Sequence, residues 1–184
     1  MAEHRKLREA WNTPYHAHAL TFSTFHRQQI LLLPQVPEIF LANLDVARKE
    51  FNFDVWSYVV MPEHVHLVIR PRGEIYSMPD ILKAIKSPAS KEIFALHPFL
   101  RDKCRVVVKG RKDEFRFWQP GGGYDHNVFT SKVAWAEIRY NHMNPVKRGL
   151  CALPTEWPYS SASAYLEELV STLIPVDVCS WGRD

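Results

Sequence analysis

The stretch VVMPEHVHLVIR, residues 59–70, contains two apolar runs separated by Pro62 and Glu63. The first run continues a segment from residue 54 that is rich in β-branched and aromatic residues, which is typical of a strand. Proline interrupts a strand because it donates no backbone hydrogen bond, so the second run starts a new strand at His64. The stretch therefore predicts strands at 54–61 and 64–70, joined by a tight turn into a hairpin.

Hydrophobic periodicity and helix or turn signals predict the elements on either side of this hairpin. They are a strand at 15–22, a helix at 37–52, a helix after Ser77, strands at 104–109 and 115–118, and a helix at 130–144 that ends near Pro145. Pro88 is expected to kink or interrupt the second helix, and Gly121–Gly123 is expected to be a loop. The order strand, helix, strand, strand, helix, strand predicts an α+β, ferredoxin-like sandwich with a central antiparallel sheet, helices on one face and an added C-terminal helix.

Length and composition indicate a single globular domain. The chain has 184 residues, of which 46% are hydrophobic and 23% charged. We expect one domain over 1–184, with a core at about 15–165 and a loose tail at 166–184. No apolar run approaches the roughly 20 residues of a membrane span, and the polar start MAEHRKLREAW has no signal-peptide core, so a cytoplasmic protein without a membrane partner is expected. The three cysteines are never spaced as CxxC, which predicts neither a disulfide framework nor a zinc knuckle.

Positive charge is concentrated between Lys83 and Arg116, where ten Lys/Arg and four Asp/Glu give a local charge of 10 − 4 = +6. Such a segment can bind a polyanion such as nucleic acid, and it can equally be a solvated helix face and loop. The candidate phosphate contacts are Lys83, Lys86, Lys91, Lys109, Arg111 and Lys112.

His64 and His66 alternate with the apolar Val65, Leu67 and Ile69, so the two histidines share the strand face opposite the predicted core. Their Cα atoms are expected about 6.5–7 Å apart, a spacing at which two neutral imidazoles can converge on one cation. A solvent-facing polar pair explains the same pattern. A second pair, His16 and His18, shows how readily the pattern arises. A (β/α)₈ metallohydrolase, which carries such a motif on its first strand, needs about 250 residues and a different strand order.

The predicted C-terminal helix supplies what two histidines lack. Tyr140 and Asn144 are four residues apart and therefore share one helix face. Asn144 can offer a carbonyl oxygen to a hard cation, and Tyr140 a phenolic oxygen beside it. A packing tyrosine and a helix-ending asparagine before proline are the alternative interpretation.

Four stretches in this order resemble the REP-associated tyrosine transposases, a branch of the single-tyrosine HUH (IS200-like) transposases. They are VVMPEHVHLVIRP, FWQPGGGYDHNVF at 117–129, RYNHMNPVKRGL at 139–150 and WPYSSASAY at 157–165. The resemblance implies a ferredoxin-like or RRM-like sheet that binds single-stranded or hairpin DNA and cuts it without a nucleotide cofactor. It also implies that His64, His66 and Asn144 bind Mg²⁺ or Mn²⁺ and that Tyr140 is the nucleophile. Many relatives have glutamine at the position of Asn144.

In such an enzyme the tyrosine attacks the scissile phosphate and leaves a 5′-phosphotyrosine and a free 3′-hydroxyl, which conserves the phosphodiester for strand transfer. The resemblance to the family also implies that Tyr124 and His126 lie near this site.

Relatives of this type include both dimers and monomers, so a homodimer stays open. Two other classes stay open as well: a noncatalytic nucleic-acid-binding module of the same fold, and an unrelated small metallohydrolase in which Tyr140 is dispensable.

Overall fold

The central sheet of the computed structural model has four antiparallel strands in the order β2-β3-β1-β6. The strands are β1 (Ala17–Ser23), β2 (Phe53–Val60), β3 (His64–Pro71) and β6 (Tyr124–Val128). The structure describes residues 12–121, 123–165 and 172–182. The hairpin predicted from residues 59–70 is confirmed as β2 and β3, and it forms one half of the sheet.

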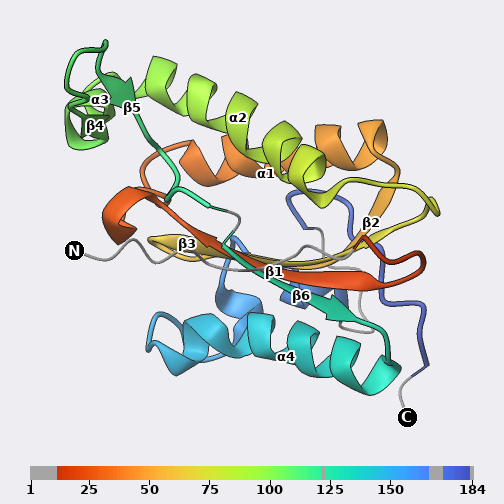
Figure 1. Cartoon of the computed structure of the whole chain (residues 1–184). Coiled ribbons are helices and arrows are strands. Elements are labelled where there is room, and N and C mark those ends of the chain that lie inside the picture. The colour runs from red at the N-terminus through yellow and green to blue at the C-terminus, as the bar shows by residue number, and fades with distance from the viewer. Residues whose placement is uncertain (1–11, 122, 166–171, 183–184) are drawn as a thin grey trace, which may run out of the picture.

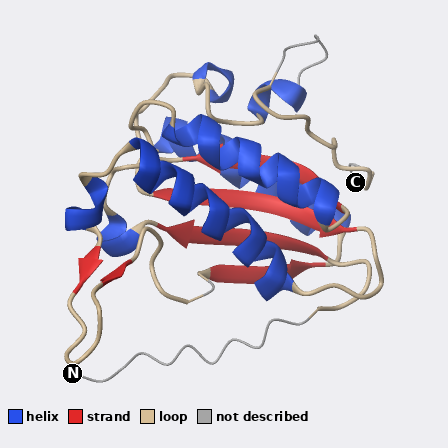
Figure 2. Ribbon diagram, turned by 90° about the horizontal axis from the view of Figure 1, so that it is seen from above, coloured by secondary structure: helices blue, strands red, loops and turns tan. Residues whose placement is uncertain are grey.

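Helices cover both faces of the sheet. On one face lie α1 (Val36–Glu50) and α2 (Met78–Leu96), and on the other lies α4 (Ser131–Lys147) (Figures 1 and 2). The Ser77 hydroxyl caps α2 by accepting a hydrogen bond from the backbone N–H of Asp80. The shorter elements are η1 (Phe25–Arg27), α3 (Leu100–Lys103), β4 (Arg105–Val106), β5 (Glu114–Phe115), η2 (Pro154–Glu156) and η3 (Ala162–Tyr165).

The alternation along β3 separates two hydrophobic cores. Val65, Leu67 and Ile69 join the larger core beneath α1 and α2, as predicted. Val68 lies on the opposite face, in a second core with residues of α4 such as Ile138. The face that carries the histidines is therefore buried beneath a helix, and the solvent-facing interpretation of the pair is wrong.

The fourth strand of the sheet is not where the sequence predicted it. The segments at 104–109 and 115–118 contribute only the two-residue strands β4 and β5, which pair with each other outside the main sheet. The edge position is taken by β6, whose sequence YDHNV lacks a continuous apolar run because part of the strand is exposed. Gly123, just before β6, has a φ of +75°, and a Cβ there would lie 2.1 Å from the Thr21 carbonyl oxygen, so the approach of β6 to β1 requires glycine.

The second helix continues through Pro88, so the predicted interruption is wrong. Residues on both sides of the proline, including Ile85 and Ala89, are fully buried in the larger core. This packing offsets the hydrogen bond that proline removes.

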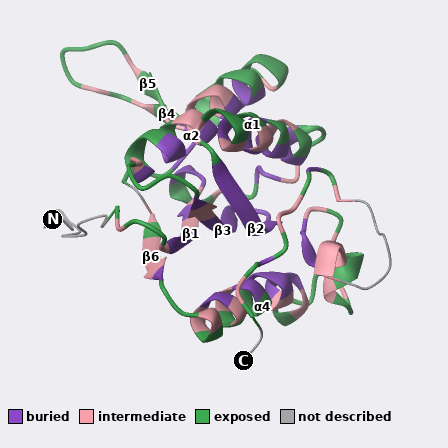
Figure 3. Cartoon of the chain, turned by 90° about the vertical axis from the view of Figure 1, so that its right-hand side faces the viewer, coloured by how far each residue is buried: buried purple, intermediate pink, exposed green. Residues whose placement is uncertain are grey.

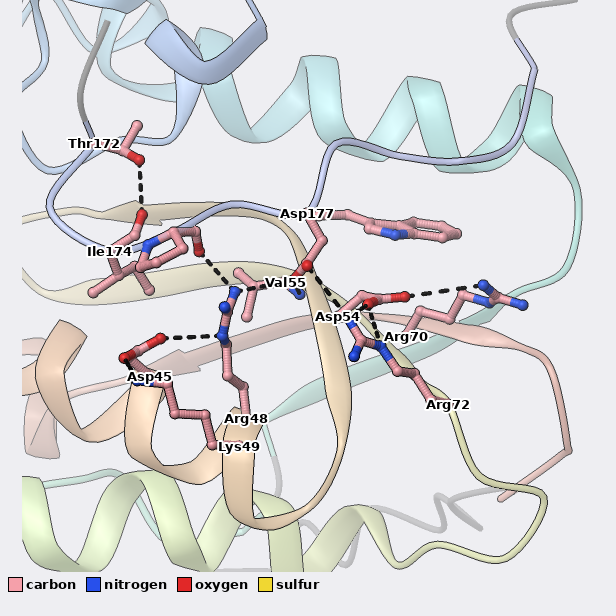
Figure 4. Close-up of polar contacts among 12 residues, drawn as sticks. Asp45, Arg48, Lys49, Asp54, Val55, Arg70, Arg72, Thr172, Ile174 and Asp177 are labelled. Carbon is pink, nitrogen blue, oxygen red and sulfur yellow. Dashed lines mark hydrogen bonds and ion pairs between the residues drawn. The ribbon is translucent and has the colours of Figure 1, made fainter.

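The C-terminal segment 172–182 packs against the sheet, whereas a loose tail was predicted from residue 166; residues 166–171 lie outside the described residues. Asp177 holds this segment beside β2 (Figure 4). Its backbone N–H donates to the Val55 carbonyl (2.9 Å), and its carboxylate accepts from the Val55 N–H (2.9 Å) and from Arg48 (3.0 Å). Residues 159–161 pair with the same strand further along, so the chain itself covers much of the outer edge of β2.

Two composition-based expectations can be compared with the structure. All three cysteines are free. In the described parts of the chain, no helix is both long and apolar enough to cross a bilayer.

Candidate functional site

The candidate site lies where β3 faces α4. His64 and His66 project from β3 toward the helix, and Asn144 projects from the helix toward the strand. The His64 and His66 Nε2 atoms are 2.9 Å apart, and the Asn144 Nδ2 atom is 3.1 Å from the His66 Nε2 atom. The fold thus brings together three side chains that the sequence predicted as metal ligands, from positions about 80 residues apart.

The other nitrogen of each imidazole has a partner on the sheet side. His64 Nδ1 lies 2.9 Å from Glu63 Oε1, and His66 Nδ1 lies 2.6 Å from Thr21 Oγ1. An ionised carboxylate only accepts hydrogen bonds, so the proton of neutral His64 sits on Nδ1. Its Nε2 lone pair then points at His66, a position suited to binding a cation.

Burial keeps both imidazoles in the neutral form that binds metals. His64 and His66 are each only 6% exposed. Burial, with a smaller contribution from the nearby His64, lowers the pKa of His66 to about 3. Burial also lowers the pKa of His64, more than the neighbouring Glu63 raises it.

The donor set fits a small divalent cation. Adjacent ligands of an octahedral ion with bonds of about 2.1 Å are about 3 Å apart, close to the 2.9 and 3.1 Å found here. A half-turn of the Asn144 amide would present its oxygen in place of its nitrogen. No group of three or more His, Cys, Asp or Glu positioned for a metal occurs within 12–121, 123–165 and 172–182.

Tyr140 lies one helical turn before Asn144 on α4. Its ring meets the His66 ring edge to face, with centroids 5.5 Å apart, and the side chain is 46% exposed. Lys147 places its ammonium group 5.2 Å from the Tyr140 ring centroid. A tyrosine that contacts His66 and is also open to solvent can meet a substrate, which a packing tyrosine in the core cannot do.

The second histidine pair does not form a comparable site. His18 is fully buried on β1, where its Nδ1 contacts Asp125 Oδ1 and its Nε2 contacts the Tyr76 hydroxyl, each at 2.8 Å. The His16 ring packs against the Phe129 ring, with centroids 5.5 Å apart. The two side chains have separate partners, so this pair serves packing and hydrogen bonding.

The residues predicted to contact phosphates lie in separate parts of the structure. Lys83 and Lys86 line a groove of about 1480 Å³ between α2 and the β1–β6 edge, together with Arg27, Trp118 and Gln119. Lys91 is exposed further along α2. Lys109, Arg111 and Lys112 are exposed on the loop between β4 and β5, which projects from the body of the protein (Figure 3).

Lys86 is the least solvated of these cations. Burial lowers its pKa to about 8. Its ammonium group lies 5.0 Å from the Phe22 ring centroid and 5.8 Å from that of Trp118. No ion pair with Lys86 occurs in the described part of the chain. A partly buried cation without an acidic partner in a groove is well placed to meet a phosphate.

Several residues around the site could not be predicted from the sequence. Glu63 and Thr21 hold the two imidazoles, and Arg148 at the end of α4 contacts Glu63. Only the position of Glu63, directly before His64, was a visible signal. Of the two residues near the site in family terms, His126 faces Glu137 of α4 at 3.7 Å and Tyr124 is 41% exposed on β6.

The sequence matches a known protein family and is similar to a curated protein. Residues 9–121, more than half of the chain, match the family model described as "Transposase IS200 like". The matched region contains His64 and His66 and ends before α4. A curated relative from Haemophilus influenzae, named "Putative REP-associated tyrosine transposase", is 26% identical over 137 residues, which cover 73% of this chain and 69% of that protein.

Two solved structures align with this chain. A REP-associated tyrosine transposase bound to a REP hairpin aligns over 100% of this chain and 98% of its own, with a TM-score of 0.67 and 18% identity. A second structure, described as a "putative transposase" from Deinococcus radiodurans, aligns over 72% of this chain and 93% of its own, with a TM-score of 0.48 and 21% identity. The first of these shows that the described part of the chain has the fold of that protein.

Proposed function

Because the chain belongs to the IS200-like transposase family, we propose that it is a metal-dependent DNA strand transferase of the HUH type with Tyr140 as its nucleophile. One observation carries the proposal: His64 Nε2 and the Asn144 amide each lie about 3 Å from His66 Nε2, beside a half-exposed tyrosine on the helix that carries Asn144. A nucleophile and a ligand on adjacent turns of α4 keep a fixed relation to the histidines of β3.

The ligands would be His64, His66 and Asn144, and the ion would be Mg²⁺ or Mn²⁺. When bound, such an ion polarises the phosphate and stabilises the charge that develops on its oxygens. The contacts of Asn144 and Tyr140 with His66 would hold α4 against β3 before DNA binds, which would lower the entropic cost of the reaction.

Tyr140 would react in a balanced transesterification. Its hydroxyl loses a proton, the phenolic oxygen forms a bond to phosphorus, and the bond from phosphorus to the 3′ oxygen breaks. The products are a 5′-phosphotyrosine and a free 3′-hydroxyl, which takes up a proton. The reverse reaction, with the 3′-hydroxyl of another strand, completes strand transfer without hydrolysis.

The substrate would be single-stranded or hairpin DNA. The structural relative with the same fold is bound to a REP hairpin, and two basic regions of this chain could contact a DNA backbone. One is the groove with Lys83 and Lys86, and the other is the β4–β5 loop with Lys109, Arg111 and Lys112. The groove also contains Trp118, next to which a partly buried cation lies.

The test is incubation of the protein with end-labelled hairpin DNA and Mn²⁺ or Mg²⁺, followed by denaturing electrophoresis. We expect a covalent protein–DNA adduct for the wild type, none for Tyr140→Phe, and loss of cleavage with retained DNA binding for His64→Ala/His66→Ala. The matched control is His16→Ala/His18→Ala assayed at a temperature where that variant is folded, and it should form the adduct.

Each alternative class gives a different result. Cleavage that survives Tyr140→Phe would indicate a metallohydrolase. Binding of the hairpin without cleavage by the wild type, with either ion, would indicate a noncatalytic binding module.

A further inference from the structure

Glu63 lies in the turn between β2 and β3, and one of its carboxylate oxygens contacts three nitrogen donors. Its Oε1 atom is 2.9 Å from His64 Nδ1, 3.1 Å from an Arg27 guanidinium nitrogen and 2.5 Å from an Arg148 guanidinium nitrogen. Glu63 is only 5% exposed. A guanidinium group only donates hydrogen bonds, so Oε1 accepts from both arginines.

The two arginines reach Glu63 from different elements. Arg148 is the C-cap of α4, and its backbone N–H donates to the Asn144 carbonyl at 3.2 Å. Arg27 follows His26 in η1, and both have positive φ angles, 53° and 54°, which are rare for residues with side chains. Such strained positions persist where surrounding contacts hold them, often at functional sites. Glu63 thus joins η1, the hairpin turn and the helix that carries Tyr140.

We propose that Glu63 is a positioning residue that fixes the orientation and tautomer of His64; this rests on the proposed function, in which His64 binds a metal ion. The carboxylate holds the His64 proton on Nδ1 and turns the Nε2 lone pair toward His66 and Asn144. It also makes the imidazole a stronger donor to a cation, as outer carboxylates do for metal-binding histidines. Glu63 cannot be a ligand from this position, because Oε1 lies on the far side of the His64 ring from Nε2.

The distribution of hydrogen bonds argues against a purely stabilising ion pair. A carboxylate gains most from arginine when both of its oxygens are bound in a bidentate pair. Here Oε1 has all three contacts, and the buried Oε2 has no hydrogen-bond partner in the described part of the chain. The two arginines hold in place the oxygen that accepts from His64, which suits orientation of the ring better than stability alone.

Two variants separate hydrogen bonding from charge. Glu63→Leu removes the acceptor, whereas Glu63→Gln keeps an acceptor oxygen and removes the charge. Mn²⁺ affinity is measured by titration calorimetry, and the His64 tautomer by long-range ¹H–¹⁵N NMR on the metal-free, full-length protein. We expect Glu63→Leu to weaken Mn²⁺ binding by about 10-fold or more and to shift His64 away from the Nδ1–H tautomer. Glu63→Gln should restore most of the affinity and the tautomer.

The control variant is Glu74→Leu, which removes an exposed carboxylate that binds Tyr15, and it should behave as wild type in both measurements. Equal Mn²⁺ affinity in Glu63→Leu and wild type would overturn the proposal, as would equal losses in Glu63→Leu and Glu63→Gln. If Glu63→Leu does not fold, the wild-type spectrum alone decides, since an Nε2–H tautomer of His64 would contradict the proposal. A wild type that binds no Mn²⁺ but has a Glu63-dependent tautomer would reject the metal in the proposed function while keeping the orienting role of Glu63.

Discussion

His142, on the buried side of α4, should make the protein sensitive to acid. Its Nε2 lies 2.9 Å from the Ser161 hydroxyl, and its ring packs 5.2 Å from that of Tyr165. Burial lowers its pKa from 6.5 to about 4. We predict that His142→Gln, which can still reach Ser161 with an amide, reduces the loss of stability at low pH.

The direction and size of the stability change caused by His142 follow from proton linkage. The unfolded chain binds a proton at His142 as the pH falls below 6.5, whereas the folded protein does not until about pH 4. The stability associated with the neutral side chain is therefore complete above pH 6.5 and is lost as the pH falls toward 4. Between pH 7.5 and 5.0 the loss from this single group is about 2 kcal/mol, since each pKa unit corresponds to about 1.4 kcal/mol.

The assay is urea unfolding at pH 7.5 and 5.0, followed by tryptophan fluorescence. The pKa values of His64 and His66 are lowered as well, so the wild type should lose more stability than His142 alone accounts for. Between the two pH values, the free energy of unfolding of His142→Gln should fall by about 2 kcal/mol less than that of the wild type. His97→Gln, at a partly exposed position at the end of α2, is the control and should follow the wild type. Identical losses in His142→Gln and wild type would refute the reasoning.

Two further predictions concern the groove and the C-terminal segment. Lys86→Met should weaken binding of hairpin DNA and reduce the slope of log affinity against log salt by about 1, as seen in fluorescence anisotropy, while Lys91→Met, outside the groove, should leave both nearly unchanged. Equal effects of the two substitutions would exclude a specific contact at Lys86. Asp177→Ala removes the acceptor for the Val55 N–H and for Arg48, so the free energy of unfolding should fall by about 1–3 kcal/mol in urea at pH 7.5. An unchanged unfolding curve would mean that this anchor contributes nothing.

The strands and helices with strong apolar periodicity could be predicted from the sequence, and the edge strand could not. The hairpin of β2 and β3 has a buried apolar face, so its pattern follows directly from the fold. In β6 the side chains of Asp125 and Asn127 point toward the groove, so polar residues replace the apolar ones that mark a strand. The signal for such a strand lies in its partner, not in its own composition.

The site was predictable to the extent that each residue has chemistry of its own. His64, His66, Asn144 and Tyr140 were found because imidazole, amide and phenol are recognisable ligands or nucleophiles, and the fold brings them together. The burial of the pair was not predictable, because it depends on α4 covering the second face of the sheet. Contacts made by residues with no distinctive pattern, such as Arg148 to Glu63, depend on tertiary structure in the same way.

The central claim is that Tyr140 becomes covalently attached to DNA, and peptide mapping of the trapped adduct tests it most directly. Trypsin should release residues 140–147, YNHMNPVK, as a peptide with a single tyrosine, because Arg139 and Lys147 precede the two cleavage sites. After nuclease digestion of the adduct formed with hairpin DNA and Mn²⁺, mass spectrometry should find the nucleotide remnant on this peptide. A remnant on the exposed Tyr124 or Tyr15 instead, or an adduct of Tyr140→Phe at the wild-type level, would contradict the account.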